Sequence, residues 1–517
     1  MAPRSSRLVV CVAAACLGAL AASCGGSKST TQSSRSASFL YTATDGLTGW
    51  ELWATDGTPA GTSRVMDIRP GSDSSDPQIA SIDGDPPAAG EPDLFCANDG
   101  VHGRELWRSD GTPGGTTLVK DIAEGLPDGI PDCILLRAGG RLFFTADDGV
   151  HGVELWTTDG TEAGTYMVSD IYAGVSGSAP NWFFAVNGRA VFVADDGVHG
   201  RELWASDGTL QGTDLVMDIV PGSASSPLFR YGEAIVGGVL YFETDDGVHG
   251  DELWRTDGTT AGTWLVKDAI PGSGPSTVTG IVGVGSTVYF FVQDMTVTVG
   301  MGLWRTDGTE AGSLLLHTFE QHWVEHVLGS TLLFTGIEEA TGYELWRTDG
   351  TVDGTVLVKD INPGPASSTP YFLLEQGGAV YFAAADDTHG QELWRTDGTE
   401  AGTTLVKDVN PGPAGSDPYW LLPCGGAMVM SATEPDHGRE LWRTDGTDAG
   451  TVLVTDANPG SASFNPWPMS DAPVGGLLLL DADDGTHGWE LWGTDCSAAG
   501  TSMLKDANPG TGDGLSD

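Results

Sequence analysis

The sequence predicts an all-β fold, a β-propeller of about ten four-stranded antiparallel blades. Three observations lead to this prediction. A motif of the form ELWxxDGT recurs along the chain at intervals of about 48 residues. Each interval contains four short apolar stretches that are separated by turn residues. The chain also contains 75 glycines among 517 residues and few long helix-favouring runs, which is typical of many short strands joined by tight turns.

The first 23 residues are expected to form a lipoprotein signal peptide. Arg4 and Arg7 precede an apolar run over residues 8–20. This run is too short to span a bilayer, but its length and its basic flank are typical of a secretory signal.

The end of this segment resembles a bacterial lipobox, because small residues precede Cys24. Ala21 departs from the usual pattern, which has leucine three residues before the cysteine. The resemblance implies lipidation of Cys24, and Gly25 in place of aspartate implies an outer-membrane lipoprotein; plain secretion is the alternative. Residues 24–37 are rich in Gly, Ser and Thr and are expected to form a flexible tether.

The repeats occupy residues 38–510, and residues 511–517 remain as a C-terminal tail. One unit begins with the apolar stretch 371–378 and continues as AVYFAAADDTHG, QELWRTDGT and TTLVKDVNPG. The four turn signals are Gly-Gly, Asp-Asp-x-x-Gly, Asp-Gly-Thr and Asn-Pro-Gly. They place Gly or Asn where a positive φ is required and Asp where its side chain caps the turn. Each unit is therefore expected to fold as four antiparallel strands.

A tryptophan marks the third strand of every unit. Alternation along a strand sends this Trp and the preceding Leu to opposite faces, so we expect them to pack against opposite neighbouring blades. Burial of each indole is worth roughly 2 to 4 kcal/mol. The ten residues are Trp53, Trp107, Trp156, Trp204, Trp254, Trp304, Trp346, Trp394, Trp442 and Trp492.

The motif and its spacing identify the chain as similar to the ELWxxDGT repeat family of bacterial exported proteins, a family without a defined molecular activity. The resemblance covers about residues 38–510. The turn RTDGTEAGT is also similar to the Asp-box hairpins of sialidase-type propellers, which are structural, although here the tryptophan precedes the turn.

Ten units could close as one ring, as two rings of five, or remain an open arc. Unit six departs from the pattern, because Gly302 replaces the repeated Glu and Thr318 replaces an Asp. A break near residue 272 would separate two rings, but one ring is favoured because it requires only one closure. Unit one lacks a first strand, so closure is expected by packing between the terminal units.

The charge of the chain argues against nucleic acid as a partner. With 24 basic and 71 acidic residues the formal net charge is −47, and this field repels phosphate backbones and anionic lipid headgroups. The acidic residues are spread evenly along the repeats, which is typical of solvated turns. A monomer is expected.

A histidine recurs in the DDGxHG turn of seven units. These imidazoles would lie on the order of 10 Å apart on neighbouring blades, whereas zinc ligands converge within about 2 Å of one ion. We therefore expect each His to bond its own hairpin, and the repeated Glu to bond an Arg or a turn amide. The histidines are His102, His151, His199, His249, His389, His437 and His487.

Two other patterns resemble metal sites. The aspartates of the Asp-Gly-Thr turns could hold calcium, but no unit supplies a compact loop of six to eight oxygens, so hairpin capping is favoured. The letters HWVEH, residues 322–326, match the H-x-x-E-H motif of inverted zinc peptidases, which requires a helix. Here they fall on a predicted strand, where alternation would separate Glu325 from His322 and His326. No catalytic residue, metal ligand or cofactor is assigned.

Four cysteines follow the predicted signal and tether, and an exported protein meets oxidising conditions. Their positions along the chain favour the pairs Cys96 with Cys133 and Cys424 with Cys496, among three connectivities that four cysteines allow.

The function expected from these observations is a lipid-anchored extracytoplasmic scaffold of the cell envelope for binding or adhesion, with a protein or a glycan as ligand. One alternative is a propeller hydrolase or lyase acting on an extracellular polymer, although the sequence contains no GxSxG, P-loop or GxGxxG motif. Another is a calcium-dependent surface protein.

Overall fold

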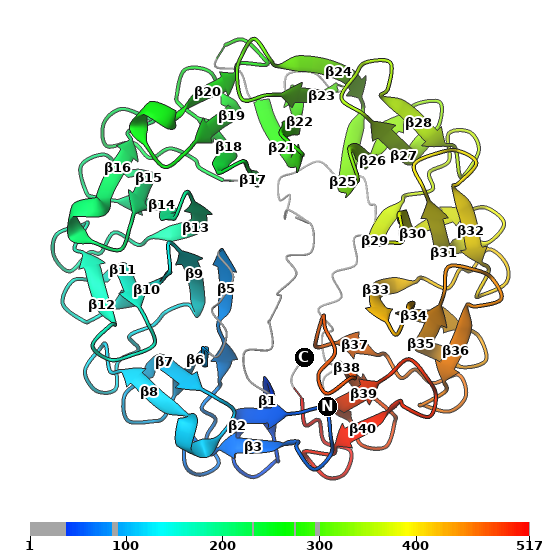
Figure 1. Ribbon diagram of the computed structural model, residues 1–517, viewed down its shortest axis with the longest axis horizontal. Helices are drawn as coiled ribbons and strands as arrows, with labels where there is room; N and C mark the ends of the chain where they lie inside the picture. The colour runs from blue at the N-terminus through cyan, green and yellow to red at the C-terminus, as the bar shows by residue number, and fades with distance from the viewer. Residues whose placement is uncertain (1–37, 85–90, 230–231, 273–275, 295–299, 516–517) are drawn as a thin grey trace, which may run out of the picture.

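The computed structural model describes residues 38–84, 91–229, 232–272, 276–294 and 300–515. These residues form ten sheets arranged in one ring, which confirms a ten-bladed β-propeller (Figure 1). Two five-bladed rings and an open arc are therefore excluded. The predicted signal peptide, the lipidation site Cys24 and the tether lie outside the described residues. Among the described residues, no helix has the length and apolar composition needed to cross a membrane.

Each blade runs from an innermost strand near the ring axis to an outermost strand at the rim (Figure 1). The innermost strands are β4 (Gln78–Ile79), β9 (Ile134–Ala138), β13 (Asn181–Val186), β17 (Glu233–Val236), β21 (Ser276–Val284), β25 (Gln321–Leu328), β29 (Tyr371–Gln376), β33 (Tyr419–Cys424) and β37 (Trp467–Pro468). The second strands are β1 (Phe39–Thr44), β6 (Asp93–Asn98), β10 (Arg141–Asp147), β14 (Arg189–Asp195), β18 (Val239–Asp245), β22 (Thr287–Asp294), β26 (Thr331–Glu338), β30 (Ala379–Asp386), β34 (Ala427–Glu434) and β38 (Leu478–Asp483).

The outer half of each blade contains the repeated motif. The third strands are β2 (Trp50–Thr55), β7 (Arg104–Ser109), β11 (Val153–Thr158), β15 (Arg201–Ser206), β19 (Asp251–Thr256), β23 (Met301–Thr306), β27 (Gly342–Thr348), β31 (Gly390–Thr396), β35 (Gly438–Thr444) and β39 (Trp489–Thr494). The outermost strands are β3 (Ser63–Met66), β8 (Thr117–Lys120), β12 (Tyr166–Ser169), β16 (Thr213–Met217), β20 (Trp264–Lys267), β24 (Leu314–Phe319), β28 (Val356–Lys359), β32 (Thr404–Lys407), β36 (Val452–Thr455) and β40 (Ser502–Lys505). Three of the turns between them contain 3-10 helices, η1 (Pro113–Gly115), η2 (Leu210–Gly212) and η3 (Thr260–Gly262).

Two blades depart from the expected four antiparallel strands. The first blade has three strands, β1 to β3, as its missing first strand predicts. The third blade gains a fifth strand, because β5 (Ser81–Gly84) pairs in parallel with β9. β5 lies between β4 and β6 of the second blade in the chain, so this pairing links the second unit to its neighbour, the third.

The apolar core lies between the blades. In one cluster Leu345 of the seventh blade meets Trp394 of the eighth. In the next cluster Leu393 of the eighth blade meets Trp442 of the ninth. Leu and Trp of one strand thus pack on opposite neighbours, as alternation requires. Within the described chain, seven of the ten repeat indoles are at most 8% exposed.

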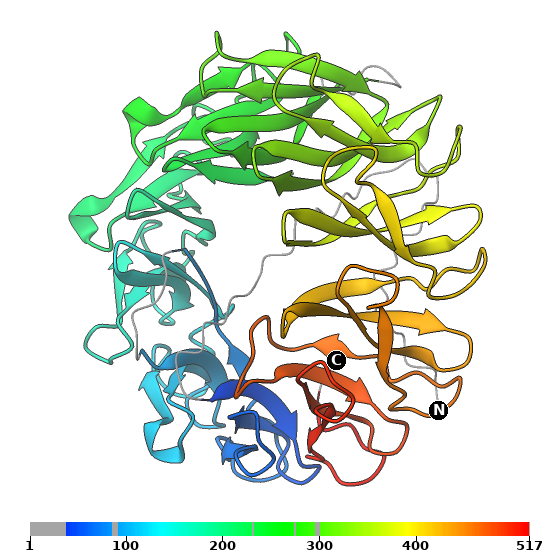
Figure 2. The same ribbon diagram turned by 45° about the vertical axis from the view of Figure 1, so that its right-hand side comes forward.

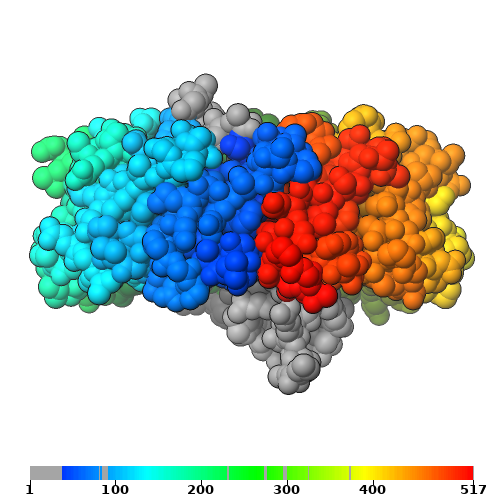
Figure 3. Space-filling model, turned by 90° about the horizontal axis from the view of Figure 1, so that it is seen from below, coloured from blue at the N-terminus to red at the C-terminus, as the bar shows by residue number. Residues whose placement is uncertain are grey.

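The ring closes with the same packing between its first and last blades. Trp53 of the first blade lies in one cluster with Leu491 of the last, and Leu515 joins them with 3% of its surface exposed. The Thr44 backbone N–H donates to the Gly514 carbonyl at 2.9 Å, and Ala43 pairs with Leu515. Figures 2 and 3 show the first blade in blue against the last in red. The tail therefore takes part in closure, in addition to the expected packing of terminal units.

Candidate functional site

The repeated glutamate of the motif forms hydrogen bonds to the loop that leads to the next blade. Glu344 is fully buried, and its carboxylate accepts hydrogen bonds from the backbone N–H groups of Ile361, Asn362 and Ser368 at 2.9 to 3.3 Å. It also accepts the Ser368 hydroxyl at 2.6 Å. The Ser368 carbonyl in turn accepts the N–H of Ala385 in the next blade. The glutamate therefore bonds turn amides, as one of the two sequence alternatives proposed, and its role is to join neighbouring blades.

Burial raises the pKa of these glutamates against the effect of their hydrogen bonds. The pKa of Glu344 is raised to about 7 because the carboxyl group is desolvated, although the Ser368 hydroxyl and the loop amides lower it. Five further units show the same pKa of about 7, at Glu105, Glu252, Glu392, Glu440 and Glu490.

The repeated histidines bond their own turns. In the second blade His102 Nδ1 lies 2.7 Å from a carboxylate oxygen of Asp99, and the other oxygen accepts the N–H groups of Val101 and His102. The hydrogen bond that the imidazole makes to the Asp99 carboxylate raises the pKa of His102 above its ordinary value. Equivalent pairs join His151 to Asp148 and His199 to Asp196 at 2.7 Å.

The aspartates of the Asp-Gly-Thr turns cap their hairpins. Asp397 Oδ1 accepts the backbone N–H of Thr399 at 2.9 Å and its hydroxyl at 2.6 Å. The hydroxyls of Thr396 and Thr403 meet beneath the turn at 2.7 Å. The described residues contain no group of three or more His, Cys, Asp or Glu arranged to hold a metal ion.

The HWVEH stretch lies on strand β25, not on a helix. The predicted separation of His322 from Glu325 is wrong, because a register shift between Trp323 and Glu325 breaks the alternation. His322 Nε2 instead lies 2.8 Å from Glu325 Oε1, and the imidazole stacks on Phe291 with 3.5 Å between ring centroids. His326 is turned to another partner, Glu375, at 3.7 Å. The stretch therefore forms two separate His–Glu pairs.

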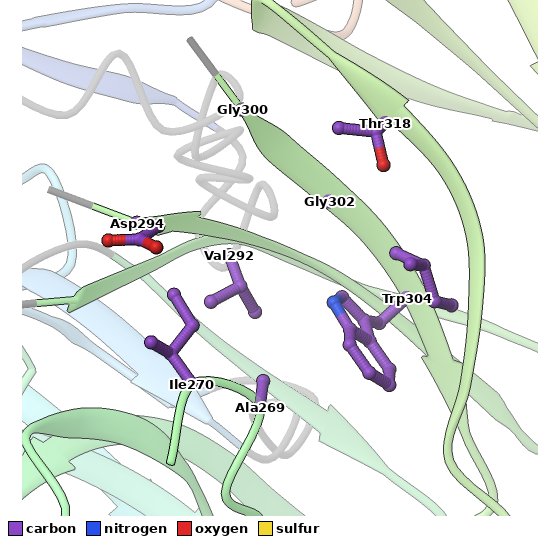
Figure 4. Close-up of a pocket in the computed structure, with 9 residues that line it drawn as sticks. Ala269, Ile270, Val292, Asp294, Gly300, Gly302, Trp304 and Thr318 are labelled. Atoms are coloured by element: carbon purple, nitrogen blue, oxygen red, sulfur yellow. The ribbon is translucent and has the colours of Figure 1, made fainter. Parts of the chain in front are cut away.

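Unit six contains a cavity of about 150 Å³ beside the position where other units carry the repeated glutamate (Figure 4). Gly302 stands at that position, and Trp304 Nε1 would lie 2.9 Å from a Cβ added there. Strand β24 continues until Phe319 pairs with Met301, so the loop that the glutamate fastens elsewhere is replaced by strand. The lining residues are Ala269, Ile270, Val292, Asp294, Gly300, Gly302, Trp304, Leu315 and Thr318.

Four exposed aromatic side chains occupy one arc of the innermost strands. They recur at the same position of units seven to ten, about 48 residues apart. We call this set the aromatic arc; its members and their exposed fractions are Trp323 (40%), Tyr371 (44%), Tyr419 (43%) and Trp467 (53%). The strands that carry them, β25, β29, β33 and β37, follow one another around the axis on the right-hand side of Figure 1.

Three of the strands that carry the aromatic arc contain a backbone irregularity, which β13 and β21 also contain. A register shift against the second strand falls next to the aromatic residue in β25 and β33, and one residue later in β29. Trp420, at the shift in β33, has a φ of 35°. Bulges of this kind redirect side chains and recur next to binding sites. Tyr419 and Trp467 are close enough to form one surface, with 5.5 Å between ring centroids.

The same position is polar in the second and fourth units. There Gln78 and Asn181 accept hydrogen bonds from Arg104 and Arg201, at 2.7 and 2.6 Å. The aromatic arc therefore breaks the repetition of the ring. Sequence reasoning missed it, because each residue alone resembles an ordinary strand residue. The sequence does contain one indication of the aromatic arc, because an aromatic residue directly follows Pro370, Pro418 and Pro466.

Both disulfides of the structure join neighbouring blades. Cys96 is bonded to Cys133 between the second and third blades, and Cys424 to Cys496 between the ninth and tenth. Cys496 has a φ of 73° at a position where the other units have glycine.

No family model and no curated protein matches this chain. Solved structures with partial similarity include a chain from a study of two prolyl endopeptidases, on their inter-domain dynamics in catalysis and specificity. It is 13% identical with a TM-score of 0.33, over 63% of this chain and 48% of that one.

A puromycin hydrolase is 14% identical with a TM-score of 0.30, over 69% of this chain and 58% of that one. A serine-to-alanine mutant of puromycin hydrolase complexed with PGG is 16% identical with a TM-score of 0.31, over 76% of this chain and 57% of that one. This chain thus spans about half the length of these structures. At such identities and scores the similarity assigns no activity to it.

Proposed function

We propose that this chain is a binding or adhesion scaffold of the bacterial cell envelope, and a member of the ELWxxDGT repeat family. Its ring is tethered outside the cytoplasm through a lipid on Cys24, and it works as a monomer that holds a macromolecular ligand. The observation that carries the binding role is the aromatic arc. Exposed Trp and Tyr clusters mark binding surfaces, because these side chains contribute large contact area at little cost in conformational entropy.

The rigid surroundings of the aromatic arc support this role. Its strands lie between neighbouring blades, and loops bound by a buried glutamate precede three of them, β29, β33 and β37. A ligand that contacts four rigid rings loses less free energy to ordering than one that binds mobile loops. Such a surface suits stable attachment.

The binding role is tested by photo-cross-linking in the bacterium that produces the protein. Benzoylphenylalanine replaces Tyr371 or Trp467 in the full chain, and as a matched control it replaces the exposed Val150 on the other half of the ring. We expect a covalent adduct to a macromolecule at the two arc positions and none at Val150. Equal adducts at all three positions, or none in the arc, would contradict the proposal.

The tether has its own test. A Cys24→Ser variant should lose incorporation of labelled fatty acid and move from the membrane fraction to the soluble fraction of the envelope. Retention of the label by this variant would exclude Cys24 as the lipidation site.

A further inference from the structure

We infer that the aromatic arc binds a cationic polypeptide segment, one that presents Lys or Arg side chains at short regular intervals. This inference rests on the proposed binding function and adds the chemical class of the ligand. Its first support is the chemistry of the rings. The face of an indole or phenol carries negative electrostatic potential, so an exposed face attracts an ammonium or guanidinium group.

The protein contains an example of this contact on its outer rim. The Arg255 guanidinium lies over the ring of Trp264, with 4.2 Å to its centroid. Strand β20 carries that indole, and the neighbouring strand β19 supplies the cation. In the aromatic arc the sequences of β25, β29, β33 and β37 contain neither Lys nor Arg, and the two histidines of β25, His322 and His326, pair with Glu325 and Glu375.

Within the aromatic arc, Tyr419 lies near the side chain of Arg439. The Arg439 guanidinium lies close enough to interact electrostatically with Tyr419, but it donates its hydrogen bonds to the Asp417 carbonyl and the Ser431 hydroxyl, at 3.0 and 3.3 Å. Its positive charge opposes a second cation at this ring. We therefore expect the two indoles, Trp323 and Trp467, to contribute more to binding than Tyr419.

Charge around the aromatic arc is complementary to such a ligand. Glu375 lies on the same strand as Tyr371 with 42% of its side chain exposed, and Asp417 is exposed two residues before Tyr419. The acidic turns stand at the same end of the blade, since Tyr419 pairs with Ser431 on β34, three residues before Glu434. The net charge of −47 adds a long-range field that attracts cations and repels anions.

The spacing of the rings favours an extended polypeptide. The centroids of Tyr419 and Trp467 are 5.5 Å apart. Two residues of an extended chain span about 7 Å, and side chains of alternate residues point to the same face. Two basic residues at alternate positions of such a segment therefore match the spacing of Tyr419 and Trp467.

The experiment measures binding of a fluorescent twelve-residue peptide of alternating Lys and Gly to the purified full chain in neutral detergent. Peptides of alternating Glu and Gly, and of Ser and Gly, serve as charge controls, and cellohexaose serves as a neutral glycan. We expect binding of the Lys peptide only, weakened by salt, and affinity at least as high when each Lys carries three methyl groups. A trimethylated Lys keeps its positive charge but has no N–H to donate. Retained affinity would therefore show that the cation binds to a ring face and not to a hydrogen-bond acceptor.

Two variant proteins assign the binding to the rings. In the first, all four residues of the aromatic arc become Leu, which keeps an apolar surface but removes the faces. Each lost face should weaken binding about two- to fivefold, so the quadruple variant should lose more than about tenfold in total. The matched control changes the four exposed valines Val101, Val150, Val198 and Val248 to Leu on the other half of the ring and should bind as the unaltered protein does.

A Tyr371→Phe variant keeps the ring face and loses only the hydroxyl, so it should retain binding. Equal binding of the Ser–Gly or Glu–Gly peptide, or full binding by the Leu variant, would overturn the inference. If cellohexaose binds through the aromatic arc and the Lys peptide does not, the ligand class is wrong while the scaffold proposal stands. If no adduct forms in the cross-linking experiment, the scaffold proposal itself fails.

Discussion

At the scale of single residues, a buried carboxylate determines how one blade meets the next. Glu344 is withdrawn from solvent, yet it satisfies three backbone N–H groups and one hydroxyl of the following loop. The sequence shows that a glutamate recurs beside the tryptophan, but it does not show whether an Arg or a turn amide is its partner. The partners lie 17 to 24 residues further along the chain, and only the closed blade brings them near.

Replacement of this carboxylate should therefore destabilise the ring. Glu344→Ala leaves buried donors without an acceptor, which costs about 3 kcal/mol or more in the free energy of unfolding. Glu344→Gln keeps one acceptor oxygen and should cost less. The check is urea denaturation, with Glu400→Ala on an exposed turn as the control. An alanine variant as stable as the control would show that the loop does not depend on Glu344.

The same glutamates predict that stability falls as the pH rises. Their pKa of about 7 in the folded state exceeds the ordinary value of 4.5, so their contribution is fully present below about pH 4.5 and is lost as the pH rises through 7. The pKa values of His102 and His151 are also raised, so their contribution is lost over the pH range above 6.5. We expect the Tm to fall by several degrees between about pH 5.5 and pH 8. A Tm that rises across this interval in differential scanning calorimetry would contradict the account.

At the scale of elements, the turns follow the sequence closely, whereas several innermost strands depart from strict alternation. Asp-Gly-Thr predicts a capped hairpin, and the Asp397 carboxylate caps it through Thr399 alone, because both partners are local. Strict alternation fails on β25, where the register shift after Trp323 places His322 beside Glu325. A bulge adds a residue without a composition that marks it, so the period of a sequence cannot reveal it.

The capping interpretation makes a prediction about metal removal. Asp397→Ala should lower the free energy of unfolding by about 1 kcal/mol, the usual worth of a side chain that caps backbone N–H groups. Because the cap uses a backbone N–H and a hydroxyl and needs no cation, a chelator should leave the Tm of the unaltered protein unchanged. A fall of several degrees with chelator, reversed by calcium, would instead support the calcium-dependent alternative.

At the scale of the whole molecule, ten similar interfaces make one ring. The sequence predicts this ring because each unit supplies a Trp and a Leu to opposite neighbours, and the first and last blades use the same pair, Trp53 and Leu491. The sequence does not predict that Gly514 and Leu515 contact the first blade and complete the ring, because residues 511–517 lack the motif. The aromatic arc is also a property of this scale, because rings on four units share one wall only when the blades stand in sequence around an axis.

The measurement that tests the closed ring most directly is an engineered disulfide between Ala43 and Leu515. These residues are Cα partners in an antiparallel bridge, at a separation that a disulfide can span. We expect the Ala43→Cys, Leu515→Cys double variant to form this bond within one monomer, identified by mass spectrometry of a non-reduced digest. Two free thiols at positions 43 and 515, or a bond between them found only in linked dimers, would show that the first and last blades do not meet within one chain.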